Sequence, residues 1–265
     1  MVTGSGAGGS GRAGPFGQAS ARVLTARVLT ARVTALVTAL LLSGCGGSSG
    51  PQAGPAGGSS GQDGSGSSRP PVGAPGSALR ALDLLAVKGR AARTGYSREQ
   101  FGPAWADVDH NGCDTRNDVL ARDLTGERFR AGTRQCVVLS GTLHDPYTDR
   151  TVVFAKSRAS AVQIDHVVSL SNAWQTGAQQ LTADRRAALA NDPLNLLAVD
   201  GPTNQAKSDA DAATWLPPYR GGWCPMVARQ VAVKRTYGLW VTAAERDAMR
   251  RVLGGCPEQA LPTGR

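Results

Sequence analysis

The sequence predicts an α+β fold with a small antiparallel element, and three features lead to this class. Segments with apolar residues at helical spacing lie near both ends of the region 78–265. Short runs rich in Val, Leu and Ile lie between them, and a polar turn separates two of these runs. The region contains no internal repeat. We therefore expect one domain in which helices surround a β-hairpin.

Helices are expected where a capping residue precedes an apolar pattern. Ser77 precedes the pattern of "SALRALDLLAVKGR", and Thr182 opens "TADRRAALAND". Thr242 begins the final helix, which the pair Gly254-Gly255 ends. Further helices are expected at 117–124 and in "SNAWQTGAQQL", "GPTNQAKSDADAATWL" and "PMVARQVAVKRTYG".

Strands are expected in three places. The segment "CVVLSGTLHDPYTDRTVVFAK" predicts two strands joined by the turn Asp-Pro-Tyr-Thr-Asp, hence a hairpin. The runs "VQIDHVVSL" and "NLLAV" are also apolar and of strand length.

The first 45 residues have the order of an export signal. Residues 12–32 carry four arginines and no acidic residue, and an apolar stretch too short to span a bilayer follows. The end of this stretch, Leu42-Ser43-Gly44-Cys45, resembles a bacterial lipobox. That resemblance implies cleavage before Cys45 and a lipid anchor on its thiol at the extracellular face of the cell membrane. An ordinary secretory signal is the alternative.

Residues 46–77 are almost wholly Gly, Ser, Pro and Ala. Such a segment cannot bury enough apolar surface to order itself, so we expect a flexible linker. The folded domain then occupies 78–265, and we expect it to be a monomer. The chain has a formal net charge of +9, and loss of the first 45 residues removes four arginines. A moderately basic domain suits a polyanionic partner, but charge alone does not identify one.

Four cysteines remain after Cys45, and an even number in an exported domain predicts two disulfides. Three connectivities exist. We favour Cys113 with Cys136 and Cys224 with Cys256, because each pair closes a compact local segment. No two of these cysteines form a CxxC pair, and this spacing argues against a zinc site.

One of only three histidines, His166, directly follows Asp165 inside an apolar run. Burying such a pair costs free energy unless a hydrogen-bond partner or a metal ion compensates it. An isolated Asp-His pair is more often structural than catalytic. Further along the chain, however, lie Asn195, Asn204 and Lys207. The conjunction of all five residues in this order favours a catalytic site.

This order resembles the motif of HNH nucleases, and in particular the family that includes the C-terminal domain of GmrSD-type restriction enzymes and many secreted actinobacterial proteins. The similarity covers most of 96–256, including "DTRNDVLARDL", "SGTLHDPYT", "IDHVVSL", "DPLNLLAVDGPTNQAKSD" and "YGLWVTAAERDAM". It implies a ββα-metal (HNH/His-Me finger) core with surrounding helices and a β-hairpin. The gap between His166 and Asn195 is longer than in minimal HNH motifs, which leaves the register open.

The resemblance implies a role for each residue of the motif. Hydrolysis of a phosphodiester requires a base for the attacking water, and neutral His166 can serve near pH 7. Asp165 and Asn204 would hold a divalent cation through oxygen atoms, which suits Mg²⁺, with Mn²⁺ as an alternative. Asn195 would fix the loop that carries His166, and Lys207 would contact a phosphate.

Three further features leave alternatives open. Arg116 could clamp a phosphate or form a salt bridge with Asp114 or Asp118. The segment "DVDHNGCDTRND" begins like a calcium loop, but its twelfth residue is Asp118 rather than Glu. His110 and His144 are expected in surface loops.

The sequence therefore predicts an exported, metal-dependent endonuclease that cuts DNA with little sequence specificity. No groove-reading helix is visible that could supply base-specific contacts. The alternatives are a degenerate HNH domain that only binds nucleic acid or a partner at the cell surface, an RNA-preferring nuclease, and a lipoprotein with a structural wall role. The last leaves the motif unexplained.

Overall fold

The computed structural model describes residues 73–263. The expected signal peptide, the lipidation site Cys45 and linker residues 46–72 lie outside the described residues. The α-helices are α1 (Ala78–Asp83), α2 (Thr115–Asp123), α3 (Leu170–Gln175), α4 (Ala183–Asn191), α5 (Gly201–Lys207), α6 (Trp223–Tyr237) and α7 (Ala243–Gly254). The strands are β1 (Leu124–Phe129), β2 (Val138–His144), β3 (Thr151–Ala155), β4 (Val162–His166) and β5 (Leu196–Asp200). Short 3₁₀ helices are η1 (Arg98–Phe101), η2 (Lys156–Ala161), η3 (Ala178–Gln180) and η4 (Arg220–Gly222).

The strands form two antiparallel sheets, so the fold class is α+β, as predicted. One sheet has the order β1-β2-β3 and contains the predicted β2–β3 hairpin, and the other consists of β4 and β5. The sequence did not predict β1, because Gly126, Glu127 and Arg128 are poor strand formers. Its pairing with β2 makes this segment a strand.

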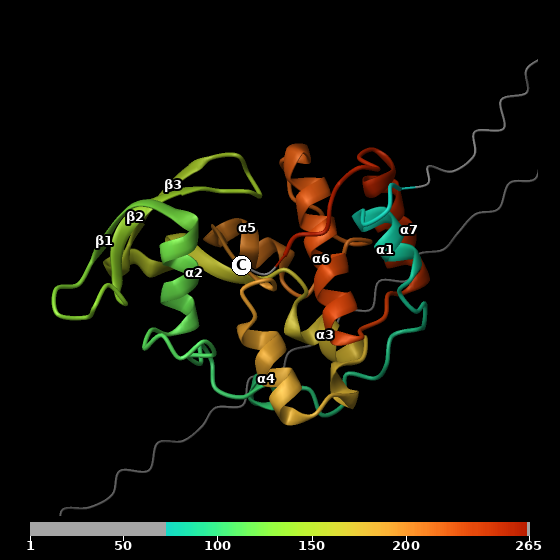
Figure 1. Ribbon diagram of the computed structural model, residues 1–265, viewed down its shortest axis with the longest axis horizontal. Helices are drawn as coiled ribbons and strands as arrows, with labels where there is room; N and C mark the ends of the chain where they lie inside the picture. The colour runs from blue at the N-terminus through green and yellow to red at the C-terminus, as the bar shows by residue number, and fades with distance from the viewer. Residues whose placement is uncertain (1–72, 264–265) are drawn as a thin grey trace, which may run out of the picture. The chain divides into compact units, whose positions relative to one another are not determined.

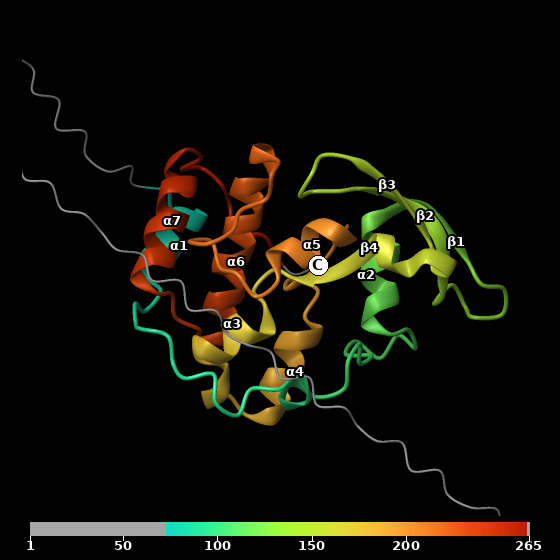
Figure 2. The same cartoon turned by 180° about the vertical axis from the view of Figure 1, so that it is seen from behind.

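Apolar clusters join the sheets to the helices. Figures 1 and 2 show the three-stranded sheet and α2 on one side of β4, and α1, α6 and α7 on the other. Leu120, Phe154 and Ile164 belong to a buried cluster between α2 and the strands. Val231 and Met249 belong to another cluster beneath α1, α6 and α7. No helix within residues 73–263 is long and apolar enough to cross a membrane.

The first helix is shorter than its apolar pattern predicts. α1 ends at Asp83, and Leu84 is 79% exposed. Beyond it, Val87 forms a bridge with Val241, and the Lys88 N–H donates to the Val241 carbonyl. This tertiary pairing overrides the helical pattern.

β4, β5 and α5 form a strand–strand–helix unit. Asp200 ends β5 and caps α5 with its side chain. A Cβ atom on Gly201, the first residue of α5, would lie 2.0 Å from the Ser160 carbonyl oxygen, so only glycine fits this junction. The helix ends at Lys207, earlier than predicted, because Ser208 adopts a φ of 52°.

The structure contains the two disulfides Cys113–Cys136 and Cys224–Cys256, which is the pairing favoured from the sequence. The first joins the loop before α2 to the segment before β2. The second joins Cys224 in the first turn of α6 to Cys256, two residues after the end of α7. Both restrict the unfolded chain and thereby favour the folded state.

Candidate active site

A pocket of about 580 Å³ follows one edge of β4. Gln163, Ile164, Asp165 and His166 line it in succession. Within residues 73–263, β4 pairs with β5 alone, and the pairing is regular through His166. Its second edge is therefore free, and side chains from both faces of the strand can border a groove along that edge. This is how Asp165 and His166, which are neighbours on a strand, come to line the same pocket.

Asp165 is buried and hydrogen-bonded through both carboxylate oxygens. Oδ1 accepts from Lys207 Nζ at 2.8 Å, and Oδ2 accepts from the Tyr147 hydroxyl at 2.6 Å. Burial raises the pKa of Asp165, and the contacts with Lys207 and Tyr147 oppose this rise by favouring the ionised form. Each oxygen of a carboxylate has two lone pairs, so each keeps one for a further ligand.

The hairpin turn between β2 and β3 brings Tyr147 to Asp165. Asp145 at the start of the turn accepts from the Thr148 N–H, and its other oxygen accepts from the Asp200 N–H at the end of β5. The turn is thereby fixed to the β5–α5 junction. Tyr147 is buried there and packs edge-on against Trp215.

Lys207, for which the sequence predicted a phosphate contact, is paired inside the protein. Its side chain is 0% exposed, and its ammonium donates to Asp165 Oδ1 and, at 2.9 Å, to the His166 carbonyl. The residue lies at the last turn of α5, on the side that faces β4. An ammonium at this position neutralises the buried carboxylate and holds the end of β4.

His166 has one ring nitrogen fixed and one available. Nε2 lies 2.8 Å from the Ala190 carbonyl, near the end of α4. A carbonyl only accepts, so Nε2 carries the proton and Nδ1 keeps the lone pair. Burial lowers the pKa of His166 from 6.5 to about 4, and the charges of Arg98 and Lys207 act in the same direction. The imidazole is therefore neutral at pH 7.

Asn195 connects the two strands near His166. Its Oδ1 accepts from the Val168 N–H at 2.9 Å, and its Nδ2 donates to the Val168 and Leu189 carbonyls, each at 3.3 Å. The side chain is fully buried. These bonds attach the segment after His166 to α4 and to the start of β5.

α3 and α4 lie between β4 and β5 in the chain and account for the long gap in the motif. The Ala190 carbonyl that holds His166 comes from α4. The segment between the strands therefore takes part in the site.

Asn204 lines the same pocket from α5. Its Nδ2 donates to Gln163 Oε1 at 3.0 Å, which fixes the orientation of the amide. Its Oδ1 accepts no hydrogen bond from the described residues. An amide carbonyl and a carboxylate on one pocket wall are oxygen ligands of the kind that hard divalent cations prefer.

Trp105 lies near both His166 and Arg116. The indole of Trp105 stacks on the imidazole of His166, with ring centroids 6.3 Å apart and an angle of 18° between the planes. The guanidinium of Arg116 lies 5.9 Å from the Trp105 ring and 3.5 Å from the Val162 carbonyl. Among the ion pairs of residues 73–263, none joins Arg116 to Asp114 or Asp118. Arg116 does not line the pocket along β4.

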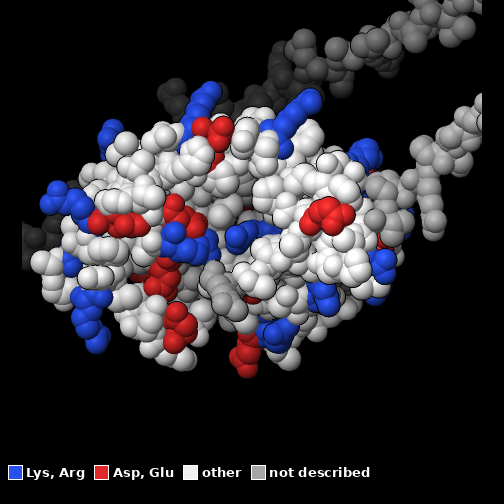
Figure 3. Space-filling model, turned by 45° about the horizontal axis from the view of Figure 1, so that its top comes forward, with Lys and Arg blue, Asp and Glu red and all other residues white. Residues whose placement is uncertain are grey.

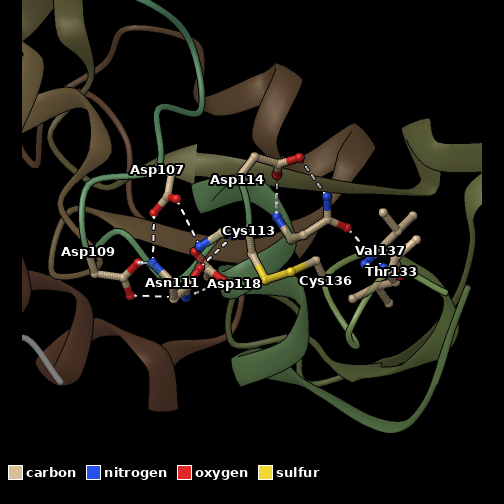
Figure 4. Close-up of a disulfide and its surroundings, with 12 residues drawn as sticks. Asp107, Asp109, Asn111, Cys113, Asp114, Asp118, Thr133, Cys136 and Val137 are labelled. Atoms are coloured by element: carbon tan, nitrogen blue, oxygen red, sulfur yellow. Dashed lines mark hydrogen bonds between the residues drawn. A yellow bond between two sulfur atoms is a disulfide. The ribbon is translucent and has the colours of Figure 1, made fainter.

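The acidic loop before α2 is closed by its own hydrogen bonds. Figure 4 shows Asp107, Asp109 and Asp118 around Asn111, beside the disulfide of Cys113. The Asn111 N–H donates to Asp107 and Asp109, and its Nδ2 donates to Asp109 and Asp118. Within the described part of the chain, no group of three or more His, Cys, Asp or Glu side chains is arranged to hold a metal ion. The structure thus does not support the calcium alternative.

On the face drawn in Figure 3, basic and acidic side chains are interspersed. His144 is exposed, as predicted, but it is the last residue of β2 rather than a loop residue. Its Nε2 lies 3.1 Å from Asp149.

Sequence reasoning missed Tyr147 and Trp105. The only local signal for Tyr147 was an aromatic residue inside the polar turn "DPYTD". The sequence around Trp105 carried no comparable signal. In the structure this residue has a φ of 60°, which is unusual for a residue other than glycine. Their contacts with Asp165 and His166 are non-local and follow from the fold.

Comparison with known proteins identifies the family. Residues 114–252 match the family described as "GmrSD restriction endonucleases, C-terminal domain". The chain therefore belongs to this family. The fold and family together define a small α+β domain with a nuclease-related function. The chain is also 39% identical, over 177 residues, to an uncharacterized secreted protein of Arthroderma benhamiae, with 66% of this chain and 82% of that protein covered. This relative is fungal, whereas the sequence predicted a resemblance to secreted actinobacterial proteins. No solved structure is significantly similar to the chain.

Proposed function

We propose that this protein is an exported endonuclease that hydrolyses phosphodiester bonds with the help of a divalent cation. The observation that carries the proposal is the joint lining of one pocket by Asp165, His166 and Asn204. β4, β5 and α5 would then be the ββα-metal core of an HNH nuclease. Membership in a restriction-endonuclease family supports the same reaction class.

His166 would act as the general base. Its Nδ1 holds the lone pair, and its Nε2 is held by the Ala190 carbonyl, so the ring cannot turn without loss of a hydrogen bond. A water molecule in the pocket would lose its proton to Nδ1 as its oxygen attacks the phosphorus atom. A low pKa makes His166 a weak base, but it keeps the imidazole unprotonated at neutral pH.

Asp165 and Asn204 fit a divalent cation. Asn204 Oδ1 is free among the described residues, and each oxygen of Asp165 keeps one lone pair beside its bond to Lys207 or Tyr147. Two protein ligands suffice for Mg²⁺, which retains several water molecules. A cation bound there would neutralise charge on the phosphate and on the leaving oxygen.

Export is supported by independent features. Two disulfides form in oxidising compartments, and the related fungal protein is described as secreted. A lipid anchor on Cys45 remains part of the proposal, with secretion as its alternative. DNA is the proposed substrate, cut with little sequence preference, and RNA is the alternative.

A nuclease assay tests the proposal. The oxidised protein is incubated with plasmid DNA, with RNA and with Mg²⁺ or Mn²⁺, and EDTA serves as the control. We expect cleavage that EDTA abolishes. Cleavage in EDTA would contradict the metal requirement, and no cleavage with any divalent cation would favour a domain that only binds nucleic acid.

Metal binding is tested separately by calorimetry with Mn²⁺. We expect Asn204→Ala to weaken binding by 10-fold or more, on the order of the loss expected for a removed ligand. Gln180→Ala, which removes an exposed amide outside the pocket, is the matched control. Equal affinity for wild type and Asn204→Ala would exclude Asn204 as a ligand.

A further inference from the structure

A second pocket, of about 250 Å³, lies beside the pocket along β4. The two pockets share Arg98, Trp105, His166 and Leu170. The other walls of the second pocket come from the segment around η1 and from the end of α4. The candidate base His166 therefore stands at the boundary between the pockets.

The two pockets differ in chemistry. The pocket along β4 is lined by the cationic side chains of Arg93 and Arg98, of which Arg93 lies 3.7 Å from Asp209 in the same pocket. The guanidinium of Arg98 suits a phosphate. The second pocket has mainly apolar walls, among them Phe101, Pro103 and Ala104. A nucleotide likewise has an anionic phosphate and a flat base whose aromatic faces pack against apolar and aromatic side chains.

We propose that the second pocket, here called the base pocket, receives the base of a nucleotide adjacent to the scissile phosphate. This inference rests on the proposed nuclease function. The shared boundary at His166 and Trp105 places a base in the pocket within one nucleotide of the reacting phosphate. Arg98 borders both pockets, so its guanidinium can contact the phosphate that joins the two parts.

The occupant must be an unpaired base. In a duplex each base is paired and stacked, and its extrusion costs a few kcal/mol. A base in a single strand enters a pocket at far lower cost, and contact with aromatic side chains is tolerant of base identity. The substrate class that fits both pockets is therefore single-stranded nucleic acid, DNA or RNA, cut without strong sequence preference.

The test compares oligomers with and without bases. The full oxidised chain is incubated with oligo(dT), oligo(U), a tetrahydrofuran-phosphate oligomer of equal length that lacks bases, and duplex DNA. We expect at least one base-containing single strand to be cleaved about 10-fold or more faster than the base-free oligomer and than the duplex. The faster of oligo(dT) and oligo(U) identifies the polymer. Equal cleavage rates for the base-containing and base-free oligomers would refute the proposal that this pocket binds a base. The proposed nuclease activity would not be affected by that result.

Filling the pocket provides the second measurement. Ala104 is exposed at the wall of the base pocket. Ala104→Trp should lower the ratio of the cleavage rate of the base-containing oligomer to that of the base-free oligomer toward 1. Ala183→Trp, the same change at an exposed alanine outside the pocket, should leave the ratio unchanged. An unchanged ratio in folded Ala104→Trp would overturn the inference. If Ala104→Trp fails to fold, the wild-type comparison decides alone. Failure of the wild type to cleave any substrate would instead refute the proposed function.

Discussion

The ammonium of Lys207 lies 2.8 Å from Oδ1 of Asp165, with both side chains almost completely buried. A charge pair in this position is costly to desolvate and is stabilised only while both partners are present. The same Lys207 Nζ also holds the carbonyl of His166. Lys207 thus contacts Asp165 and His166, the first two residues of the predicted motif, from inside the protein.

Replacement of Lys207 by Met should destabilise the fold. The change retains most of the aliphatic stem but leaves the Asp165 carboxylate buried without a countercharge, at a cost of about 3–5 kcal/mol. Urea unfolding measures this loss. Lys156→Met, at an exposed lysine, should change stability by less than about 0.5 kcal/mol. A normal stability with a raised KM would instead indicate that Lys207 contacts the substrate.

Replacement of Tyr147 by Phe should reduce both stability and activity. It removes the hydroxyl that donates to Asp165 Oδ2, and an unmet buried acceptor costs about 1–3 kcal/mol. Asp165 should then be held less rigidly, so kcat on plasmid DNA should fall. Tyr219→Phe, at a tyrosine that is 39% exposed, is the matched control. Equal kcat and unfolding free energy for Tyr147→Phe and wild type would refute the role of the hydroxyl.

The pH dependence of kcat/KM should reflect the low pKa of His166. The neutral imidazole is the active form, and burial lowers the pKa to about 4. Activity carried by this group is therefore fully present at pH 7, stays constant to about pH 5, and is lost as the pH falls through about 4. Circular dichroism over the same range separates this loss from unfolding. An inflection near pH 6.5 would show that the imidazole titrates as it would in water.

Removal of the Cys113–Cys136 disulfide should affect activity as well as stability. Cys113 closes the loop that follows Trp105, and Trp105 stacks on His166. Replacing both cysteines by Ser should cost about 3 kcal/mol of unfolding free energy and should lower the cleavage rate under conditions where the protein stays folded.

The second disulfide provides the control for this experiment. Ser substitutions at Cys224 and Cys256 should cost a similar free energy, because the sequence separations are 32 and 23 residues. They should leave the rate per folded molecule unchanged, since neither cysteine lines the pocket along β4. Equal loss of rate in both double variants would indicate a general loss of stability.

Local signals were sufficient for much of the fold. Thr182 and Thr242 cap α4 and α7 as the sequence predicted, because a cap depends on residues within one helical turn. The β2–β3 hairpin also follows from its turn residues. By contrast, β1 and the end of α1 depend on partners distant in sequence, and no local pattern reveals them.

The candidate site was predictable in its residues but less so in its contacts. The order of Asp165, His166 and Asn204 in the sequence led to one pocket. The buried pairing of Lys207 with Asp165 was not predicted, because helical spacing did not indicate that its side chain faces β4. The contact of the Ala190 carbonyl with His166 could not be predicted from the sequence, because every residue has a backbone carbonyl.

The cleavage rate of His166→Ala tests the central claim most directly. Plasmid DNA is incubated with the oxidised protein and Mg²⁺, and His144→Ala, at an exposed histidine outside the pocket, is the matched control. Loss of a general base predicts a rate about 10²–10⁴-fold below wild type for His166→Ala and no change for His144→Ala. A wild-type rate in folded His166→Ala would contradict the assignment of this pocket as the active site.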